Sequence, residues 1–484
     1  MSKEAIKGLE PKLVWEHFYG ITQVPRPSKK EGKIRAHIKN WAKEHGFSFK
    51  EDKVGNIVIS VPATKGHEKS PTVVLQGHVD MVCEKNKGTK HDFDNDPIEI
   101  HREGEWITAD GTTLGADNGI GVAAAMAVAL DKSAVHGPLE LLLTIDEETG
   151  MTGVGALKKN FISGKVLLNM DSEEDGVFYV GCSGGQDTVG VFKIDWTRAK
   201  RGTQAYEVMV TGLKGGHSGL DIHQGRANAI KLLAQLLNKF DFPFQIAEVS
   251  GGSLRNAIPR EAEAILMIDS KNVNKAKRII KKFIADSLLE FKTTDGGLNV
   301  KFKKVAKKNS KVFKKELQEN LINALLALPH GVMAMSADIP GLVETSTNLA
   351  TVTMDEKKIT VGTSQRSSIE SAKDNVTGSV LAVFKLAGAN AQIGDGYPGW
   401  KPNMDSKLLK LAKDVYKRLF KKDAEIKAIH AGLETGLLGS KYPGLDMISF
   451  GPTILGAHSP DEKVNIKDVE KFYKLLKGIL KKLA

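Results

Sequence analysis

The sequence predicts an α/β protein in which a mostly parallel sheet with helices on both faces is interrupted by an inserted α+β region with an antiparallel sheet. In the first third of the chain, helical patterns alternate with short apolar runs, which is typical of strands covered on both faces. Between about residues 187 and 396, longer segments alternate apolar and polar residues. This second pattern is typical of an antiparallel sheet with helices on one face.

Four apolar runs are expected as strands of the parallel sheet, and each is followed by acidic residues, histidine or both. They are residues 71–76, 139–145, 165–168 and 446–450. Ligands of open α/β sheets bind outside the carboxyl ends of the strands, so these polar residues are expected to share one crevice.

The last apolar run lies near the C-terminus, so we expect the first sheet to resume after the insertion. Residues 1–186 and 397–484 then form one discontinuous domain, and residues 187–396 form the inserted domain. The insert is long enough for two similar halves, although no clean internal repeat is visible. The glycine-rich segments 181–186 and 390–400 are the expected hinges.

Composition excludes several classes of protein. The chain has 484 residues, of which 41% are hydrophobic, and this length supports two or three domains without covalent cross-links. Two cysteines, Cys83 and Cys182, are too few for a disulfide framework or a cysteine-built zinc site. The first residues lack the apolar core of a signal peptide, and no apolar run reaches the roughly 20 residues of a membrane helix. We therefore expect a cytoplasmic protein.

The net charge of +11 comes from one segment rather than from the whole chain. Residues 271–317 contain 15 Lys+Arg and 4 Asp+Glu, which gives 15 − 4 = +11. Apolar residues such as Ile280, Phe283 and Leu288 recur there at helical spacing, so the lysines fit the solvated face of an amphipathic helix. The C-terminal segment 471–484 has the same character. We expect neither nucleic acid nor membrane as a partner.

Histidines and carboxylates dominate the residues that are expected to gather at the sheet edge. They are His78, Asp80, Asp117, Glu147, Glu148, Asp171 and His458. Crowded carboxylates repel one another unless a cation neutralises them, and imidazole with carboxylate but no thiolate suits zinc, cobalt or manganese. These residues outnumber the three or so ligands of one catalytic ion, which indicates two metal ions.

Spacing predicts a division of roles among these residues. His78 and Asp80 are two residues apart, so on extended backbone they face the same way, as a ligand and its orienting partner. Asp117 lies in a glycine-flanked loop before an expected helix at 120–130, where a helix cap and a metal ligand are equally good interpretations. Glu147 and Glu148 are adjacent and cannot point identically, which fits one ligand and one unligated general base.

Several of these residues lie in segments that resemble a known family, the cocatalytic zinc metallopeptidases that include aminoacylase and carboxypeptidase G. The segments are QGHVDMV (76–82), LGADNGIGVA (114–123), TIDEETGMTG (144–153), NMDSEED (169–175) and GAHSPDE (456–462). Further similar segments lie at 212–229, 251–264, 363–368 and 430–436. The similarity extends over the whole chain in order and is greatest to the aminoacylhistidine dipeptidase branch of the family.

The resemblance implies a specific set of metal ligands. His78 and Asp171 would hold one zinc ion, Glu148 and His458 would hold the other, and Asp117 would bridge the two. Asp80 would orient His78, and Glu147 would act as general base for a water molecule that bridges the metals. The implied cofactors are two Zn²⁺ per chain, with Co²⁺ or Mn²⁺ as alternatives.

The resemblance also assigns residues of the inserted domain, which would act as a lid. His217 matches a histidine that stabilises the oxyanion, although by its sequence alone a loop histidine beside glycines is the better interpretation. Asn256 and Arg366 match residues that grip the C-terminal carboxylate of the substrate, for which an arginine fork is the expected partner. We expect the chain to form a homodimer.

The implied activity is hydrolysis of Xaa-His and other unblocked dipeptides, which are the expected small-molecule partners. A related amidohydrolase, either an aminopeptidase or an N-acyl amino acid deacylase, is the alternative within the same chemistry. A binding protein that holds nucleic acid through residues 271–317 is the alternative outside it, and the intact Glu147, His217 and metal ligands argue against this class.

Overall fold

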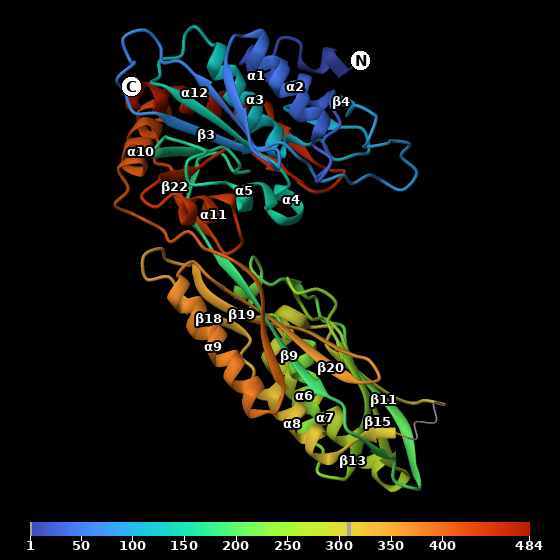
Figure 1. The fold of residues 1–484 in the computed structure, drawn as a ribbon. Coiled ribbons are helices and arrows are strands. Elements are labelled where there is room, and N and C mark those ends of the chain that lie inside the picture. Colours follow the sequence, from blue (N-terminus) through green and yellow to red (C-terminus); the bar gives the residue numbers. More distant parts are fainter. Residues whose placement is uncertain (1, 307–310) are drawn as a thin grey trace. The chain divides into compact units, whose positions relative to one another are not determined.

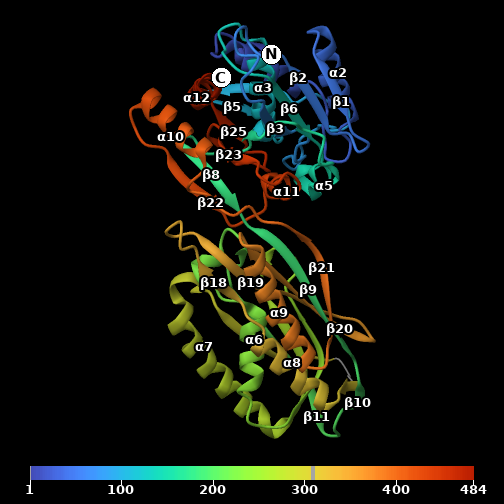
Figure 2. The same cartoon turned by 60° about the vertical axis from the view of Figure 1, so that its left-hand side comes forward.

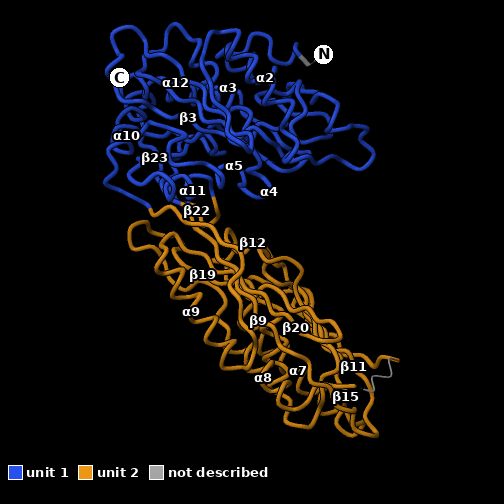
Figure 3. Tube along the Cα trace, viewed as in Figure 1, with its two compact units in different colours: residues 1–181, 402–428, 433–484 blue, residues 182–401, 429–432 orange. Residues whose placement is uncertain are grey.

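The computed structural model describes residues 2–306 and 311–484. The chain divides into two compact units, which Figure 3 distinguishes by colour. Unit 1 comprises residues 1–181, 402–428 and 433–484, and unit 2 comprises residues 182–401 and 429–432. Unit 1 is therefore built from both ends of the chain, with most of unit 2 inserted between them.

Unit 1 contains an eight-stranded sheet whose central strands are parallel. In spatial order the strands are β1 (Ser48–Glu51), β2 (Ile57–Val61), β6 (Leu139–Thr144), β3 (Val73–His78), β7 (Val166–Asn169), β23 (Asp446–Ser449), β8 (Val177–Cys182) and β22 (Glu425–Ile429). β6, β3, β7 and β23 pair in parallel, whereas β2 and β8 flank them in the opposite direction. β23 comes from the C-terminal part, so the sheet resumes after the insertion as the sequence predicts.

Helices lie on both sides of this sheet, with α3 and α12 on one side and α5 and α11 on the other (Figure 1). The helices of unit 1 are η1 (Ser2–Ile6), α1 (Lys12–Thr22), α2 (Gly32–Glu44), α3 (Ala116–Leu130), α4 (Glu147–Gly150), α5 (Thr152–Ala156), α10 (Lys407–Phe420), α11 (Glu434–Lys441) and α12 (Ile466–Leu483). A small sheet of β24 (Ile454–Leu455), β25 (Lys463–Asn465), β5 (Trp106–Ala109) and β4 (Ile100–Glu103) completes the unit.

The apolar runs are strands because both of their faces are covered. Every residue of β3 and of β6 is buried. The small side chains of α3 allow this buried helix to pack closely against β3 and α1. α12 is amphipathic and is capped by Asn465, whose side chain accepts a hydrogen bond from the Asp468 N–H.

Unit 2 consists of an antiparallel sheet with helices on one face. The strands are, in order, β16 (Asn299–Lys304), β11 (Thr203–Thr211), β15 (Ala262–Asp269), β13 (Phe244–Gly251), β19 (Val343–Met354), β20 (Lys358–Ser367), β9 (Gly184–Lys193) and β21 (Asn390–Tyr397), with β18 (Gly331–Met335) beside β19. The short pairs are β10 (Trp196–Arg198) with β17 (Lys311–Phe313), and β12 (Gly216–His217) with β14 (Ala257–Ile258). The fold class predicted from the sequence is confirmed in both units.

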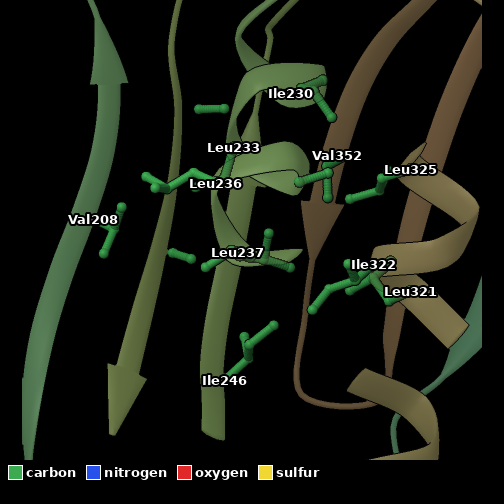
Figure 4. Close-up of a cluster of buried hydrophobic side chains, with 14 of the residues drawn as sticks. Val208, Ile230, Leu233, Leu236, Leu237, Ile246, Leu321, Ile322, Leu325 and Val352 are labelled. Atoms are coloured by element: carbon green, nitrogen blue, oxygen red, sulfur yellow. The ribbon is translucent and has the colours of Figure 1, made fainter. Parts of the chain in front are cut away.

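Four helices cover one face of the unit 2 sheet, as Figure 2 shows. They are α6 (Ala229–Asn238), α7 (Val273–Asp295), α8 (Lys315–Ala327) and α9 (Glu370–Leu386), and short 3₁₀ turns lie at η2 (Ile222–Gln224) and η3 (Ser270–Asn272). Apolar side chains from these helices and from the strands beneath them form one buried core (Figure 4). Burial of this core is the main source of the unit's stability.

The unit 2 sheet contains two β-α-β-β-α-β segments that meet at its middle. One runs β11-α6-β13-β15-α7-β16, and the other runs β9-α8-β19-β20-α9-β21 with the first segment inserted after β9. They join where β13 pairs with β19, at Gly251 opposite Val352. The connection places β20, β9 and β21 side by side although they come from distant parts of the sequence.

The lysine-rich segment forms ordinary elements of unit 2. α7 buries Ala276, Ile280 and Phe283 and leaves most of its lysines exposed, so the prediction of an amphipathic helix is confirmed there. The rest of the segment contributes β16, β17 and the start of α8, and residues 307–310 lie outside the described residues. Among the helices described, none combines the length and the apolar character needed to cross a bilayer.

Candidate metal centre

The carboxyl ends of three neighbouring parallel strands supply most of the predicted site. β3 ends at His78, β6 is followed by Glu147 and Glu148, and β7 is followed by Asp171. His78 lies opposite Thr144, the last residue of β6, so the two strands end at the same level. Parallel strands that end together bring the residues after them into one place, which is why these side chains meet.

Two histidines hold the two oxygens of one carboxylate. His78 Nε2 lies 3.1 Å from Asp117 Oδ1, and His458 Nε2 lies 3.2 Å from Asp117 Oδ2. Asp171 Oδ1 is 3.3 Å from His78 Nε2, and Glu148 Oε2 is 3.0 Å from His458 Nε2. The arrangement is two groups of potential metal ligands, His78 with Asp171 and His458 with Glu148, that share Asp117.

Asp117 occupies the first turn of α3 without capping it. Its backbone is not helical, and Gly115 takes the capping position. The Asp117 side chain instead contacts His78 and His458, so it is not a helix cap, and its role as a metal ligand stays a prediction.

Asp80 organises both sides of the cluster. Its Oδ1 lies 3.3 Å from His78 Nδ1, which leaves Nε2 of that ring facing Asp117. The same carboxylate accepts hydrogen bonds from the backbone N–H groups of Glu147, at 3.1 Å, and Glu148, at 3.3 Å. Asp80 is completely buried and therefore links the orientation of His78 to the position of the two glutamates.

The electrostatics of the cluster suit the binding of positive charge. Burial raises the pKa of Asp171 to about 7 and raises the pKa of Glu147 well above its usual value. Hydrogen bonds to Asp117 and Glu148 raise the pKa of His458 to about 11. Glu148 Oε1 is buried and has no hydrogen-bond partner among the described residues. These oxygen and imidazole donors fit divalent cations such as zinc, cobalt or manganese, which would take the place of the protons.

Residues 74–482 match the peptidase family M20/M25/M40. The chain belongs to this family. It is 42% identical over 477 residues to the cytosol non-specific dipeptidase of Escherichia coli (strain K12), and the alignment covers 98% of each chain. The family membership that the sequence motifs indicated is confirmed.

Solved structures agree with this assignment. An aminoacylhistidine dipeptidase from Vibrio alginolyticus superposes with a TM-score of 0.92 at 43% identity, over 100% of this chain and 99% of that one. An aminopeptidase from Bacillus cereus ATCC 10987 superposes with a TM-score of 0.56 at 16% identity, over 98% of this chain and 99% of that one. The second likeness is one of fold alone.

Glu462 is a site residue that the sequence analysis missed. Its buried carboxylate accepts hydrogen bonds from the consecutive backbone N–H groups of residues 114–117, at 2.8, 2.9, 2.7 and 3.2 Å. Because Glu462 lies four residues after His458, it ties the loop of His458 to the loop of Asp117. The sequence feature that could have identified Glu462 is its position in the same motif as His458.

Arg26 supports the same loop through a carbonyl oxygen, and no sequence motif pointed to it. Its buried guanidinium donates hydrogen bonds to the carbonyl oxygens of Val79, at 3.1 Å, and Asp80, at 2.7 Å, and also to that of Gly115. Nearby Glu462, Asp80 and Asp117 partly offset the cost of burying this charge, although burial still lowers the pKa of Arg26. Arg26 therefore fixes the end of β3 relative to the Asp117 loop.

Glu434, at the start of α11, forms a polar network beneath the cluster. Its Oε2 accepts hydrogen bonds from Gln76, at 2.6 Å, and Thr144, at 2.7 Å, and burial raises its pKa to about 8. Asn169 donates to Gln76 at 2.5 Å. This network joins the ends of β3, β6 and β7, which keeps the three strands in register below the metal ligands.

In unit 2, His217 and Asn256 line one cavity of about 800 Å³, and Arg366 is not among its lining residues. The His217 Nδ1 accepts hydrogen bonds from the N–H groups of Gly219, at 3.2 Å, and Leu220, at 3.0 Å. Burial and the nearby Arg366 lower the pKa of His217, so the ring is neutral with its proton on Nε2. A neutral imidazole in this tautomer can donate a hydrogen bond to an oxyanion.

Binding of divalent cations to the metal-free protein near pH 7 is expected to release about one or more protons per ion, because ligands that are protonated without metal must lose their protons. The raised pKa values of Asp171 and His458 set the direction: metal affinity rises with pH. Calorimetric titration with zinc in two buffers of different ionisation enthalpy measures this release. Identical heats in both buffers would contradict it.

Replacing Glu462 by Gln is expected to lower the free energy of unfolding by about 2–5 kcal/mol, because an amide cannot accept four hydrogen bonds and removes one of the negative charges near the buried Arg26. Chemical denaturation of the metal-free protein measures the change. Asp461→Asn, at an exposed position of the same loop, is the control and is expected to leave stability within about 0.5 kcal/mol.

Proposed function

We propose that this protein is a metal-dependent dipeptidase that hydrolyses Xaa-His and other unblocked dipeptides. The observation that carries this proposal is the pair of ligand groups sharing Asp117, with Glu147 beside them. The names of the cytosol non-specific dipeptidase and the aminoacylhistidine dipeptidase, each matched over nearly the whole chain, support the substrate class. The first of these names also supports a cytosolic location.

The two ligand groups are the proposed sites of two divalent cations, with zinc as the first candidate. His78 and Asp171 would hold one ion, His458 and Glu148 would hold the other, and Asp117 would bind both through its two oxygens. When bound, the cations would activate the attacking water and stabilise negative charge on the peptide carbonyl oxygen. Asp80 would hold His78 in the tautomer that directs Nε2 toward the metal.

Glu147 is the proposed general base. Its backbone N–H is fixed by Asp80, and its carboxylate is not among the closest partners of either histidine. A raised pKa suits a carboxylate that must take a proton from water and return it to the leaving amine. We propose that Glu147 performs both transfers.

Three residues of unit 2 are the proposed substrate contacts. His217, with its proton on Nε2, would donate to the oxyanion of the tetrahedral intermediate. Arg366 would bind the C-terminal carboxylate as a charged donor, and Asn256 would assist through its amide. A site that binds both the free amine and the free carboxylate selects peptides of two residues.

Glu147→Gln is expected to lower kcat on Gly-Leu by about 100-fold or more, because the amide cannot accept the proton. The same preparations are assayed for zinc content. Retention of two ions per chain with lost turnover supports the role of general base. Loss of one ion would instead identify Glu147 as a ligand, since it also forms a potential ligand group with His78 and Glu148.

The function itself is tested with β-Ala-His, Gly-His, Gly-Leu and Gly-Gly-His, assayed before chelation, after chelation and after addition of zinc or cobalt. We expect the dipeptides to be cleaved, cleavage to stop on chelation because the ligand groups lose their cations, and activity to return with metal. Cleavage of the tripeptide would favour an aminopeptidase. An N-acetyl amino acid is assayed beside these peptides, and its cleavage would favour a deacylase.

A further inference from the structure

Four residues form a row across the second half of the unit 2 sheet. Ser346 on β19 pairs with Arg366 on β20, Arg366 pairs with Gly185 on β9, and Gly185 pairs with Tyr397 on β21. Directly paired residues of neighbouring strands point to the same face of a sheet. Because Gly185 has no side chain, the Tyr397 ring can lie over it and reach Arg366.

Tyr397 is held rigidly in this position. A Cβ atom on Gly185 would lie 2.6 Å from the tyrosine ring, and one on Gly432 would lie 2.7 Å from it, so glycine is required on both sides. The backbone oxygen of Tyr397 accepts a hydrogen bond from Lys373 Nζ at 2.9 Å. Tyr397 belongs to the glycine-rich segment that the sequence analysis interpreted only as a hinge.

Arg366 is a buried cation without a counter-ion. It is 7% exposed, its Nε has no hydrogen-bond partner, and no acidic side chain in the described part of the chain forms an ion pair with it. Asp187, two residues along β9 from Gly185, pairs with Arg255 at 3.5 Å. A buried charge is costly unless it is paired, so Arg366 is suited to an anion that arrives from outside.

Among the described residues, the hydroxyl of Tyr397 is the hydrogen-bond partner of this guanidinium. Arg366 Nη1 donates a hydrogen bond to the Tyr397 hydroxyl oxygen at 2.8 Å. A hydroxyl that accepts through its oxygen still has its own hydrogen to donate. Burial raises the pKa of Tyr397, so the phenol keeps that hydrogen at neutral pH. The two side chains therefore present donors to the same anion.

A histidine, His430, contacts Ser346 of the row but adds no charge. His430 Nε2 lies 2.7 Å from the Ser346 hydroxyl, and burial together with Arg366 lowers the pKa of His430 to about 3. A neutral His430 neither repels Arg366 nor competes with it for an anion. The specificity of the row for an anion therefore depends on Arg366 and Tyr397.

We infer that the Tyr397 hydroxyl is a second donor to the C-terminal carboxylate of the substrate, beside Arg366, and that it makes the enzyme discriminate against peptides whose C-terminus is blocked. This inference rests on the proposed function. A carboxylate has two oxygens and can accept from the guanidinium and the phenol together, and the Arg366–Tyr397 hydrogen bond polarises both donors. An uncharged terminal amide gains much less from the same pair.

The test is Tyr397→Phe, assayed on Gly-Leu and on Gly-Leu amide. Loss of a hydrogen bond to a charged group is expected to raise KM for Gly-Leu about 10- to 100-fold and to leave kcat within about twofold. The preference for Gly-Leu over its amide falls by the same factor. Tyr206→Phe is the matched control, since that hydroxyl lies near Gln204 elsewhere in the same sheet, and it is expected to change neither constant.

Arg366→Lys separates this inference from the proposed function. If Arg366→Lys reduces the preference for the free carboxylate and Tyr397→Phe does not, the role of Tyr397 is overturned and that of Arg366 stands. If neither variant changes the preference, the carboxylate assignment of Arg366 itself is wrong. If both variants reduce the preference for the free carboxylate, the double variant is expected to reduce it by less than the product of the two single factors, because both donors bind one anion.

Binding without turnover provides a second measurement. Calorimetric titration of the zinc-loaded Glu147→Gln protein with Gly-Leu is expected to give a Kd about 10-fold or more weaker when Tyr397→Phe is added than when Tyr206→Phe or no further change is added. An unchanged Kd would overturn the inference. A metal-loaded wild type that cleaves no dipeptide would overturn the proposed function, and this titration would then decide the role of Tyr397 separately.

Discussion

The constraint on which unit 1 depends is the burial of several carboxylates at one edge of a parallel sheet. Asp80, Asp117, Glu148 and Asp171 lie within a few ångströms of two imidazoles. In water these groups would repel one another only weakly, but inside the protein the repulsion is large. Three features offset this repulsion. The histidines are protonated, backbone N–H groups donate hydrogen bonds to Asp80, and the arrangement of ligands suits divalent cations.

The surroundings of the cluster act mainly on backbone geometry. Glu462 accepts hydrogen bonds from N–H groups of the loop before α3, Arg26 donates to a carbonyl oxygen of the same loop, and Glu434 joins the ends of β3 and β6. These groups are buried and charged or strongly polar, so each is stable only while its partners are in place. A shift of one loop would leave the others unpaired, which makes the positions of Asp117 and His458 interdependent.

Unit 2 contains a buried charge of the opposite sign, that of Arg366. Arg366 is buried and forms no ion pair with an acidic side chain of the described residues, whereas the unit 1 cluster gathers several buried carboxylates. A carboxylate of the proposed substrate would neutralise Arg366, and the proposed divalent cations would neutralise the carboxylates of the cluster. In the sheet of unit 2, Gly185 has no side chain and therefore leaves the space in which the Tyr397 ring reaches Arg366.

Local sequence patterns were sufficient to predict much of the fold and of the candidate metal centre. Apolar runs that end in acids identified β3, β6, β7 and β23, and the motifs that contain His78, Asp117 and His458 indicated both the family and the residues that meet. Periodicity indicated the antiparallel sheet and the amphipathic α7 and α12. These features depend on residues close in sequence or on short motifs, and such signals remain visible in a single chain.

The tertiary structure alone decided which distant residues support the site. Arg26 belongs to no chemical pattern that sequence reasoning could separate from ordinary charged residues, and Glu434 lies in the similar segment 430–436 but had no role assigned to it. Glu462 differs from an exposed loop acid only because four N–H groups lie opposite it. Tyr397 acquires its partner through strand order, since β20 and β21 reach opposite edges of β9 and residues 366 and 397 meet over one glycine. The sequence by itself determined the family and the chemistry of the ligands, whereas partnerships set by strand order and loop packing arise only when the chain is folded.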